Sequence, residues 1–134
     1  MIRELQKVLL AEDEPDIREV ASMSLEMLGG LTLEVCESGV DVVDKALSFK
    51  PDIVVLDVMM PNMDGPSALA ALRATPGCEA IPVVFMTAKV MQEEVDELWR
   101  LGASDVIAKP FDPVTLPSRL QELWLKINES IDDK

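Results

Sequence analysis

Short apolar runs recur along this chain at intervals of a few tens of residues, and they constrain its fold more than any other feature. One of the five runs, Leu31–Val35, alternates apolar and polar residues, which indicates an edge strand with one face partly in solvent. The other four are continuous, as is typical of strands covered on both faces. The continuous runs are Val8–Ala11, Ile53–Leu56, Val83–Met86 and Val106–Ala108.

Helix-like segments with ordinary start and stop signals lie between these runs. Gly29-Gly30 closes the first of them, and Pro117 near the start of the last predicts an irregular opening turn. Strand and helix alternate five times, which predicts an α/β fold with a parallel sheet, right-handed crossovers and three layers. The predicted helices span about residues 13–28, 39–49, 66–74, 90–101 and 113–130.

Length and charge bound the classes of function. A chain of 134 residues predicts one domain, 1–134, of which about 130–134 form an acidic tail. With 25 acidic and 12 basic side chains, the formal charge of -13 would repel nucleic acid. No apolar stretch approaches the roughly 20 residues that span a bilayer, so we expect a cytoplasmic protein without a membrane partner. The chain contains no histidine, which excludes a His-based zinc site, a catalytic triad and an internal phosphohistidine.

Polar residues follow the predicted strands where each one ends. Glu12 and Asp13 follow the first strand, Asp57 the third, Thr87 the fourth and Lys109 the fifth. Each alone has an ordinary structural explanation, such as a turn cap or a solvated lysine. The carboxyl ends of parallel strands share one edge of a sheet, where ligands bind, so we expect the five side chains to meet there.

This combination of groups favours one kind of chemistry. At ~5 Å and an effective dielectric constant of ~20, each carboxylate pair repels by up to roughly 3 kcal/mol, so a cation is expected among them. Oxygen ligands favour Mg²⁺, with Mn²⁺ as the alternative. Lys109 and Thr87 are suited to hold phosphate oxygens beside a carboxylate nucleophile. A dinucleotide or flavin phosphate site is disfavoured, because acidic residues 12–14 occupy the turn where a glycine-rich loop would lie.

With these residues in place, the chain resembles the receiver domains of bacterial two-component response regulators over about Lys7 to Ile127. The resemblance implies a flavodoxin-like three-layer sandwich, a five-stranded parallel sheet in the order 2-1-3-4-5 and five alternating helices. The segments that carry it are 8–14, 52–65, 87–88 and 102–111.

The resemblance also implies a role for each residue at the strand ends. Asp57 would accept a phosphoryl group from a phosphohistidine on a sensor histidine kinase or a histidine phosphotransfer protein. Magnesium would be held by Asp13, by Asp57 and by the backbone carbonyl of Met59, with Glu12 acting through water. Lys109 would pair with Asp57 before transfer and with the phosphoryl group afterwards, next to a Lys109–Pro110 bond that is usually cis in the family.

Phosphorylation would then draw the Thr87 hydroxyl inward and shift the loop at Ala88. Receivers commonly couple this movement to an aromatic side chain on the fifth strand. Val106 occupies that position here, so an aromatic rotamer switch is absent and the signal must pass through backbone and helix shifts. Pro110 belongs to the same switch or partner face.

The helix near 90–101 carries Met91, Val95 and Trp99 on one stripe beside Val106. Two interpretations stay open, ordinary core packing and an exposed apolar patch where receivers often dimerise or bind partners. Leu98 and Leu101 are better placed for the core, which favours the surface for Trp99. Trp124 in the last helix is a candidate member of the same patch.

The favoured function is therefore a phosphorylation-dependent signalling switch rather than an enzyme, with the fourth helix, fifth strand and fifth helix as its partner face and as the face of any homodimer. An alternative is a receiver excised from a larger response regulator or hybrid histidine kinase. An aspartyl phosphatase would need a second aspartate two residues after Asp57, where Met59 stands. A receiver-like module that no longer accepts phosphate would lack an acid, Asp57, Thr87 or Lys109, and all are present.

Overall fold

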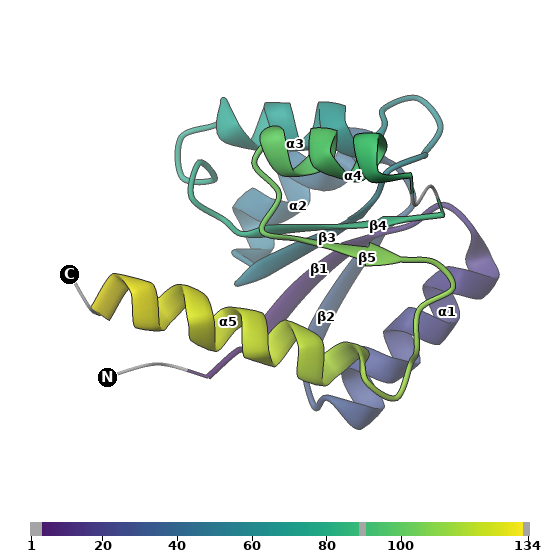
Figure 1. The fold of residues 1–134 in the computed structure, drawn as a ribbon, viewed down its shortest axis with the longest axis vertical. Coiled ribbons are helices and arrows are strands. Elements are labelled where there is room, and N and C mark those ends of the chain that lie inside the picture. The colour runs from purple at the N-terminus through teal and green to yellow at the C-terminus, as the bar shows by residue number, and fades with distance from the viewer. Residues whose placement is uncertain (1–3, 89–90, 133–134) are drawn as a thin grey trace.

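A single parallel sheet organises the chain in the computed structural model, which describes residues 4–88 and 91–132. The strand order is β2-β1-β3-β4-β5, so the expected sheet and strand order are confirmed (Figure 1). All four pairings between neighbouring strands are parallel. The strands are β1 Lys7–Ala11, β2 Thr32–Cys36, β3 Ile53–Asp57, β4 Val83–Thr87 and β5 Asp105–Ala108.

Helices cover both faces of the sheet, with α2, α3 and α4 on one face and α1 and α5 on the other (Figure 1). A π-helical turn, Ser24–Leu28, continues α1, and a short 3₁₀ turn, Gly39–Asp41, precedes α2. The α-helices are α1 Pro15–Met23, α2 Val42–Phe49, α3 Gly65–Arg73, α4 Gln92–Arg100 and α5 Leu116–Asp132.

Two apolar cores result from this arrangement, one on each face of the sheet. Side chains that alternate along a strand go to opposite cores, as Leu9 and Leu10 of β1 do. Leu69 and Leu72 of α3 close the first core, while Leu120 of α5 closes the second. Because β1, β3 and β4 are covered on both sides, they hold the residues at their carboxyl ends in fixed positions.

The expectation that the run Val106–Ala108 is covered on both faces is confirmed only in part: Ile107 packs in one core and Val106 against the other, but β5 is an edge strand. Ile107 is buried, but Val106 is only partly buried and Ala108 is exposed. No described strand pairs with its outer side, where the Arg119 guanidinium donates instead to the Val106 carbonyl oxygen at 2.9 Å. The edge position predicted for the alternating run Leu31–Val35 is confirmed, because β2 is the strand at the other end of the sheet.

Several helix boundaries also differ from the expectations. The helix expected over 13–28 begins at Pro15 and changes to π-helical geometry at Ser24, whose hydroxyl donates to the Pro113 carbonyl oxygen at 2.5 Å. The last helix has an irregular opening and begins at Leu116, as expected, but it continues to Asp132 rather than giving way to a tail at 130. Residues 133 and 134, and the expected helix start at 90, lie outside the described residues.

Within the described part of the chain, no helix combines the length and the apolar character needed to cross a membrane.

Candidate functional site

The register of the sheet brings the ends of four strands together. Ala11 of β1 is level with Leu56 of β3, so Glu12 and Asp57 end neighbouring strands at the same height. Thr87 of β4 is level with Ala108 of β5, and the Lys109 N–H donates to the Thr87 carbonyl oxygen at 2.8 Å. Residues far apart in sequence therefore share one edge of the sheet, where parallel sheets bind ligands.

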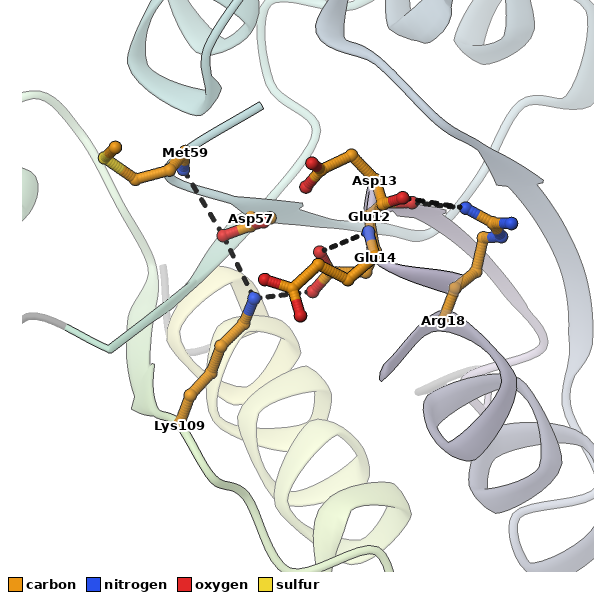
Figure 2. Close-up of polar contacts among 7 residues, drawn as sticks. All are labelled: Glu12, Asp13, Glu14, Arg18, Asp57, Met59 and Lys109. Atoms are coloured by element: carbon orange, nitrogen blue, oxygen red, sulfur yellow. Dashed lines mark hydrogen bonds and ion pairs between the residues drawn. The ribbon is translucent and has the colours of Figure 1, made fainter. Parts of the chain in front are cut away.

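The Lys109 ammonium lies between two carboxylates at this edge. Its Nζ is 2.6 Å from Glu12 Oε1 and 3.1 Å from Asp57 Oδ1, and Figure 2 shows the side chain reaching across to both acids. The Glu12 side chain is fully buried, and the side chains of Asp57 and Lys109 are 7% and 11% exposed. These are charge-assisted contacts largely removed from water, which makes their geometry well defined.

Burial and proximity change the pKa values of Glu12 and Lys109. Burial of the Glu12 carboxyl, reinforced by its hydrogen bond with Asp57, raises the pKa of Glu12 to about 7, although Lys109 opposes the rise. Burial on its own would lower the pKa of Lys109, but hydrogen bonds to Glu12 and Asp57 outweigh it and raise that pKa. The lysine therefore stays protonated, whereas Glu12 changes charge near neutral pH.

The three acidic residues form a set of oxygen donors suited to a hard cation. Glu12, Asp13 and Asp57 each offer a carboxylate oxygen, and these oxygens lie within 4.8 Å of one another. Among the described residues, Asp13 Oδ1 is buried and has no hydrogen-bond partner. A buried oxygen without a donor is costly. The donor set and this oxygen both fit Mg²⁺, which prefers carboxylate ligands and keeps several waters.

The loop after β3 is wound closely around Asp57. The Met59 N–H donates to Asp57 Oδ1 at 3.3 Å, as Figure 2 shows, while the Met59 side chain is 61% exposed. The Gly65 N–H donates to the Val58 carbonyl oxygen at 3.0 Å. A β-carbon at Gly65 would lie 2.5 Å from the Asp57 carbonyl oxygen, so α3 can start this close to β3 only from a glycine. The carbonyl of Met59 stays a predicted ligand.

Three other expected residues lie next to this cluster. Thr87 is buried at the end of β4, and Ala88 after it is exposed. The Lys109–Pro110 bond is cis, as the resemblance implied, and Pro110 is exposed.

Arg18 is a contact of the site that the sequence reasoning missed. Its Nη1 donates to the carbonyl oxygen of Glu12 at 3.0 Å and to that of Asp13 at 3.4 Å (Figure 2). One signal was available, since α1 carries a basic residue in its first turns, where the helix dipole favours acids. Arg18 reaches past the helix start to the backbone of the acidic loop.

The predicted partner face is partly core and partly surface. Met91 and Trp99 are 64% and 47% exposed, whereas Val95 and Val106 are half-buried. Leu98 is buried as expected, but the expectation for Leu101 is wrong, because it lies exposed just after α4 ends.

Trp124 does not join this face. It packs on the core under α1 and α5, whereas α4 covers the opposite side of the sheet (Figure 1). The expectation failed because neighbouring positions of a helix point in different directions. Leu123 and Lys126 line the same surface pocket as Trp99, whereas Trp124 lines a different pocket together with Leu5.

Comparison with curated proteins gives one consistent family. The family model "Response regulator receiver domain" matches residues 8–121. The chain is 37% identical over 126 residues to the transcriptional regulatory protein CreB of Escherichia coli, covering 92% of this chain and 53% of that protein. It is 31% identical to the response regulator Rre1 of Synechocystis, covering 93% and 54%. The chain thus spans about half the length of these relatives.

Solved structures agree with this result. The chemotaxis response regulator CheY4 of Vibrio cholerae superposes with a TM-score of 0.81 at 30% identity, covering 89% of this chain and 98% of that one. The signal receiver domain of a histidine kinase from Syntrophus aciditrophicus gives a TM-score of 0.80 at 30% identity, covering 91% and 92%. Sequence match, fold and strand-end cluster lead to one conclusion: the chain belongs to the receiver domain family of two-component response regulators.

Proposed function

We propose that Asp57 is the phosphoacceptor of a signalling switch that takes its phosphoryl group from a phosphohistidine on a sensor histidine kinase or a histidine phosphotransfer protein. The observation that carries the proposal is the position of the Asp57 carboxylate, 3.1 Å from the Lys109 ammonium and within 4.8 Å of the Glu12 and Asp13 oxygens. Membership of the receiver family supports it, and the given sequence contains no histidine that could serve as the donor.

The chemical step is a transfer between two nucleophiles. A carboxylate oxygen of Asp57 attacks phosphorus, an O–P bond forms and the N–P bond to the donor imidazole breaks. The electron pair of that bond returns to the imidazole nitrogen, which takes up a proton. Lys109, already beside Asp57, would shift from the carboxylate to the new phosphoryl oxygens, and Thr87 would donate its hydroxyl to another of them.

The acidic residues would hold the divalent ion in this scheme. Asp13 and Asp57 would be direct ligands together with the carbonyl of Met59, and Glu12 would contribute through water. Bound Mg²⁺, or Mn²⁺ in its place, would neutralise the charge of the carboxylates and of the phosphoryl oxygens. The unpaired Asp13 oxygen supports this assignment, because coordination would satisfy it.

The output of the switch would be a changed surface rather than a reaction on an external substrate. We place that surface over α4, β5 and α5, with Met91, Trp99 and Val106 at its centre, and homodimers would use the same face. The charge of -13 disfavours contact with nucleic acid or an anionic membrane surface by this chain, and we place its action in the cytoplasm. The curated relatives are about twice as long as this chain. An alternative is therefore that the domain works as the receiver of a larger regulator or hybrid kinase.

Labelling with acetyl phosphate tests the proposal. The wild type should incorporate one phosphoryl group in the presence of Mg²⁺ and none with EDTA, and Asp57→Asn should incorporate none. Asp64→Asn is the matched control, because Asp64 lies in the same loop but its Oδ1 caps α3 at the Ser67 N–H, 2.8 Å away. Equal labelling of Asp57→Asn and Asp64→Asn would overturn the proposal.

A further inference from the structure

The segment Cys36–Gly39, which starts at the last residue of β2, contacts the loop that carries the first two acids of the site. The Cys36 carbonyl oxygen accepts a hydrogen bond from the Glu12 N–H at 3.0 Å. Next to it, Glu37 Oε1 lies 3.4 Å from Arg18 Nη2. The same guanidinium donates through Nη1 to the carbonyl oxygens of residues 12 and 13. Residues 36 and 37 therefore hold the acidic loop directly and through Arg18.

The same segment also contacts the loop that follows Asp57. The Ser38 hydroxyl donates to the Pro61 carbonyl oxygen at 3.1 Å, and the Gly39 N–H donates to the Met63 carbonyl oxygen at 3.1 Å. There is no room between these backbones, since a β-carbon at Gly39 would overlap the Met63 carbonyl oxygen and would lie 3.1 Å from that of Asp64. Four consecutive residues thus join the two loops that supply the metal-binding oxygens.

We propose that Cys36–Gly39 is a brace that sets the separation of these two loops, and that Arg18 and Gly39 are positioning residues for the divalent ion. The inference rests on the proposed metal site at Glu12, Asp13 and Asp57. Magnesium demands near-ideal octahedral geometry at 2.0–2.1 Å from its ligands, so a small change in loop separation weakens binding. Groups that orient metal ligands contribute about 10–100-fold to metal affinity.

The brace explains why Arg18 lies inside an acidic region without a buried carboxylate of its own. Its described partners are two carbonyl oxygens and the Glu37 carboxylate, whose side chain is 75% exposed. An exposed ion pair contributes little to stability. The two carbonyl hydrogen bonds instead fix the path of the backbone from Glu12 to Asp13, which aims both side chains.

Substitution of Gly39 tests the proposal with a closely matched control. Gly39→Ala pushes the loop after β3 away from the brace, and the Mg²⁺ dissociation constant, measured by isothermal titration calorimetry, should rise about tenfold. Gly29→Ala introduces the same kind of clash, 2.7 Å from the Leu25 carbonyl oxygen and 2.9 Å from the Pro117 β-carbon. Gly29 precedes β2 and Gly39 follows it. The control therefore acts at the amino ends of the strands, away from the acidic residues at their carboxyl ends, and should leave Mg²⁺ affinity unchanged.

Arg18 is tested in the same way. Arg18→Gln should weaken Mg²⁺ binding about tenfold, and Arg18→Lys, which keeps the charge and one donor, should recover part of the loss. Arg119→Gln is the control, because Arg119 also joins a carboxylate, Asp105, to a backbone carbonyl, but does so at the β5 edge. It should leave Mg²⁺ affinity as in the wild type.

The outcomes separate this inference from the proposed function. If the wild type itself does not bind Mg²⁺, or if Asp13→Ala binds as well as the wild type, the proposed metal site fails. If the wild type binds and Asp13→Ala does not, while Gly39→Ala and Arg18→Gln bind like the wild type, the brace alone is overturned. Equal weakening by Gly39→Ala and Gly29→Ala would also overturn it, because the effect would then follow general stability.

Discussion

Lys109 lies closer to Glu12 than to Asp57: its Nζ is 2.6 Å from Glu12 Oε1 and 3.1 Å from Asp57 Oδ1. The resemblance to receivers implied a pairing with Asp57 alone, and the structure shows an ammonium shared by two buried acids. The contact with Glu12 gives the lysine a partner that is present whether or not Asp57 is modified. In the proposed transfer, Lys109 would therefore leave Asp57 for a phosphoryl oxygen without becoming an unpaired buried charge.

The raised pKa of Glu12 predicts how the metal-free protein responds to pH. With a folded pKa of about 7 against an ordinary value of 4.5, the folded state keeps a proton that the unfolded chain releases between these values. The free energy of unfolding should therefore fall as pH rises from ~4.5 to ~7, by up to about 3 kcal/mol from this group. Urea unfolding in EDTA measures the fall.

Glu12→Gln isolates the contribution of this one carboxyl. Because glutamine does not titrate, the variant should lose the part of the pH dependence that Glu12 causes, while the other acids of the chain contribute as before. Parallel pH profiles for wild type and variant would contradict the assignment.

Asp13→Ala should act in opposite directions on metal-free and metal-bound protein. Without metal, the substitution removes a buried oxygen that has no partner among the described residues, so the free energy of unfolding should rise by about 1 kcal/mol. With Mg²⁺, the wild type should gain stability by mass action and the variant much less. Thermal melting with and without Mg²⁺ checks both effects, and an equal Mg²⁺-dependent increase in melting temperature in the two proteins would count against Asp13 as a ligand.

The two tryptophans offer matched probes of the proposed partner face. Trp99 lies on α4, whereas Trp124 of α5 packs against the core on the opposite side of the sheet. Addition of beryllofluoride and Mg²⁺, which mimic the phosphorylated state, should change the emission of Trp99 in the Trp124→Phe variant. The emission of Trp124 in the Trp99→Phe variant should stay constant. A change confined to Trp124 would place the conformational change in the core under α1 and α5 and would contradict an output surface centred on Met91, Trp99 and Val106.

The parts of this molecule that the sequence predicts best are those fixed by local pattern and by parallel topology. Buried strands such as Ile53–Asp57 are recognisable from composition, and parallel pairing alone places Glu12, Asp57 and Lys109 at one edge. The partial exposure of β5 was not predicted, because the composition of an apolar run does not show how much of the strand is exposed.

Contacts between loops could not be predicted in this way. Arg18, Ser38 and Gly39 are common residue types in ordinary positions, and nothing in their spacing indicates that Ser38 meets Pro61 or that Gly39 meets Met63. These contacts depend on how two loops pack after the sheet has formed. The burial of Leu98 and the exposure of Leu101 likewise depend on where α4 ends, because Leu98 lies within the helix and Leu101 follows its last residue, Arg100.

Locating the phosphoryl group tests the central claim most directly. After reaction with acetyl phosphate and Mg²⁺, borohydride reduces an aspartyl phosphate to homoserine, which mass spectrometry of peptides places at one position. The account predicts homoserine at position 57 in the wild type, and its loss when Mg²⁺ is chelated. Homoserine at another aspartate, or equal modification of position 57 without a divalent ion, would contradict it.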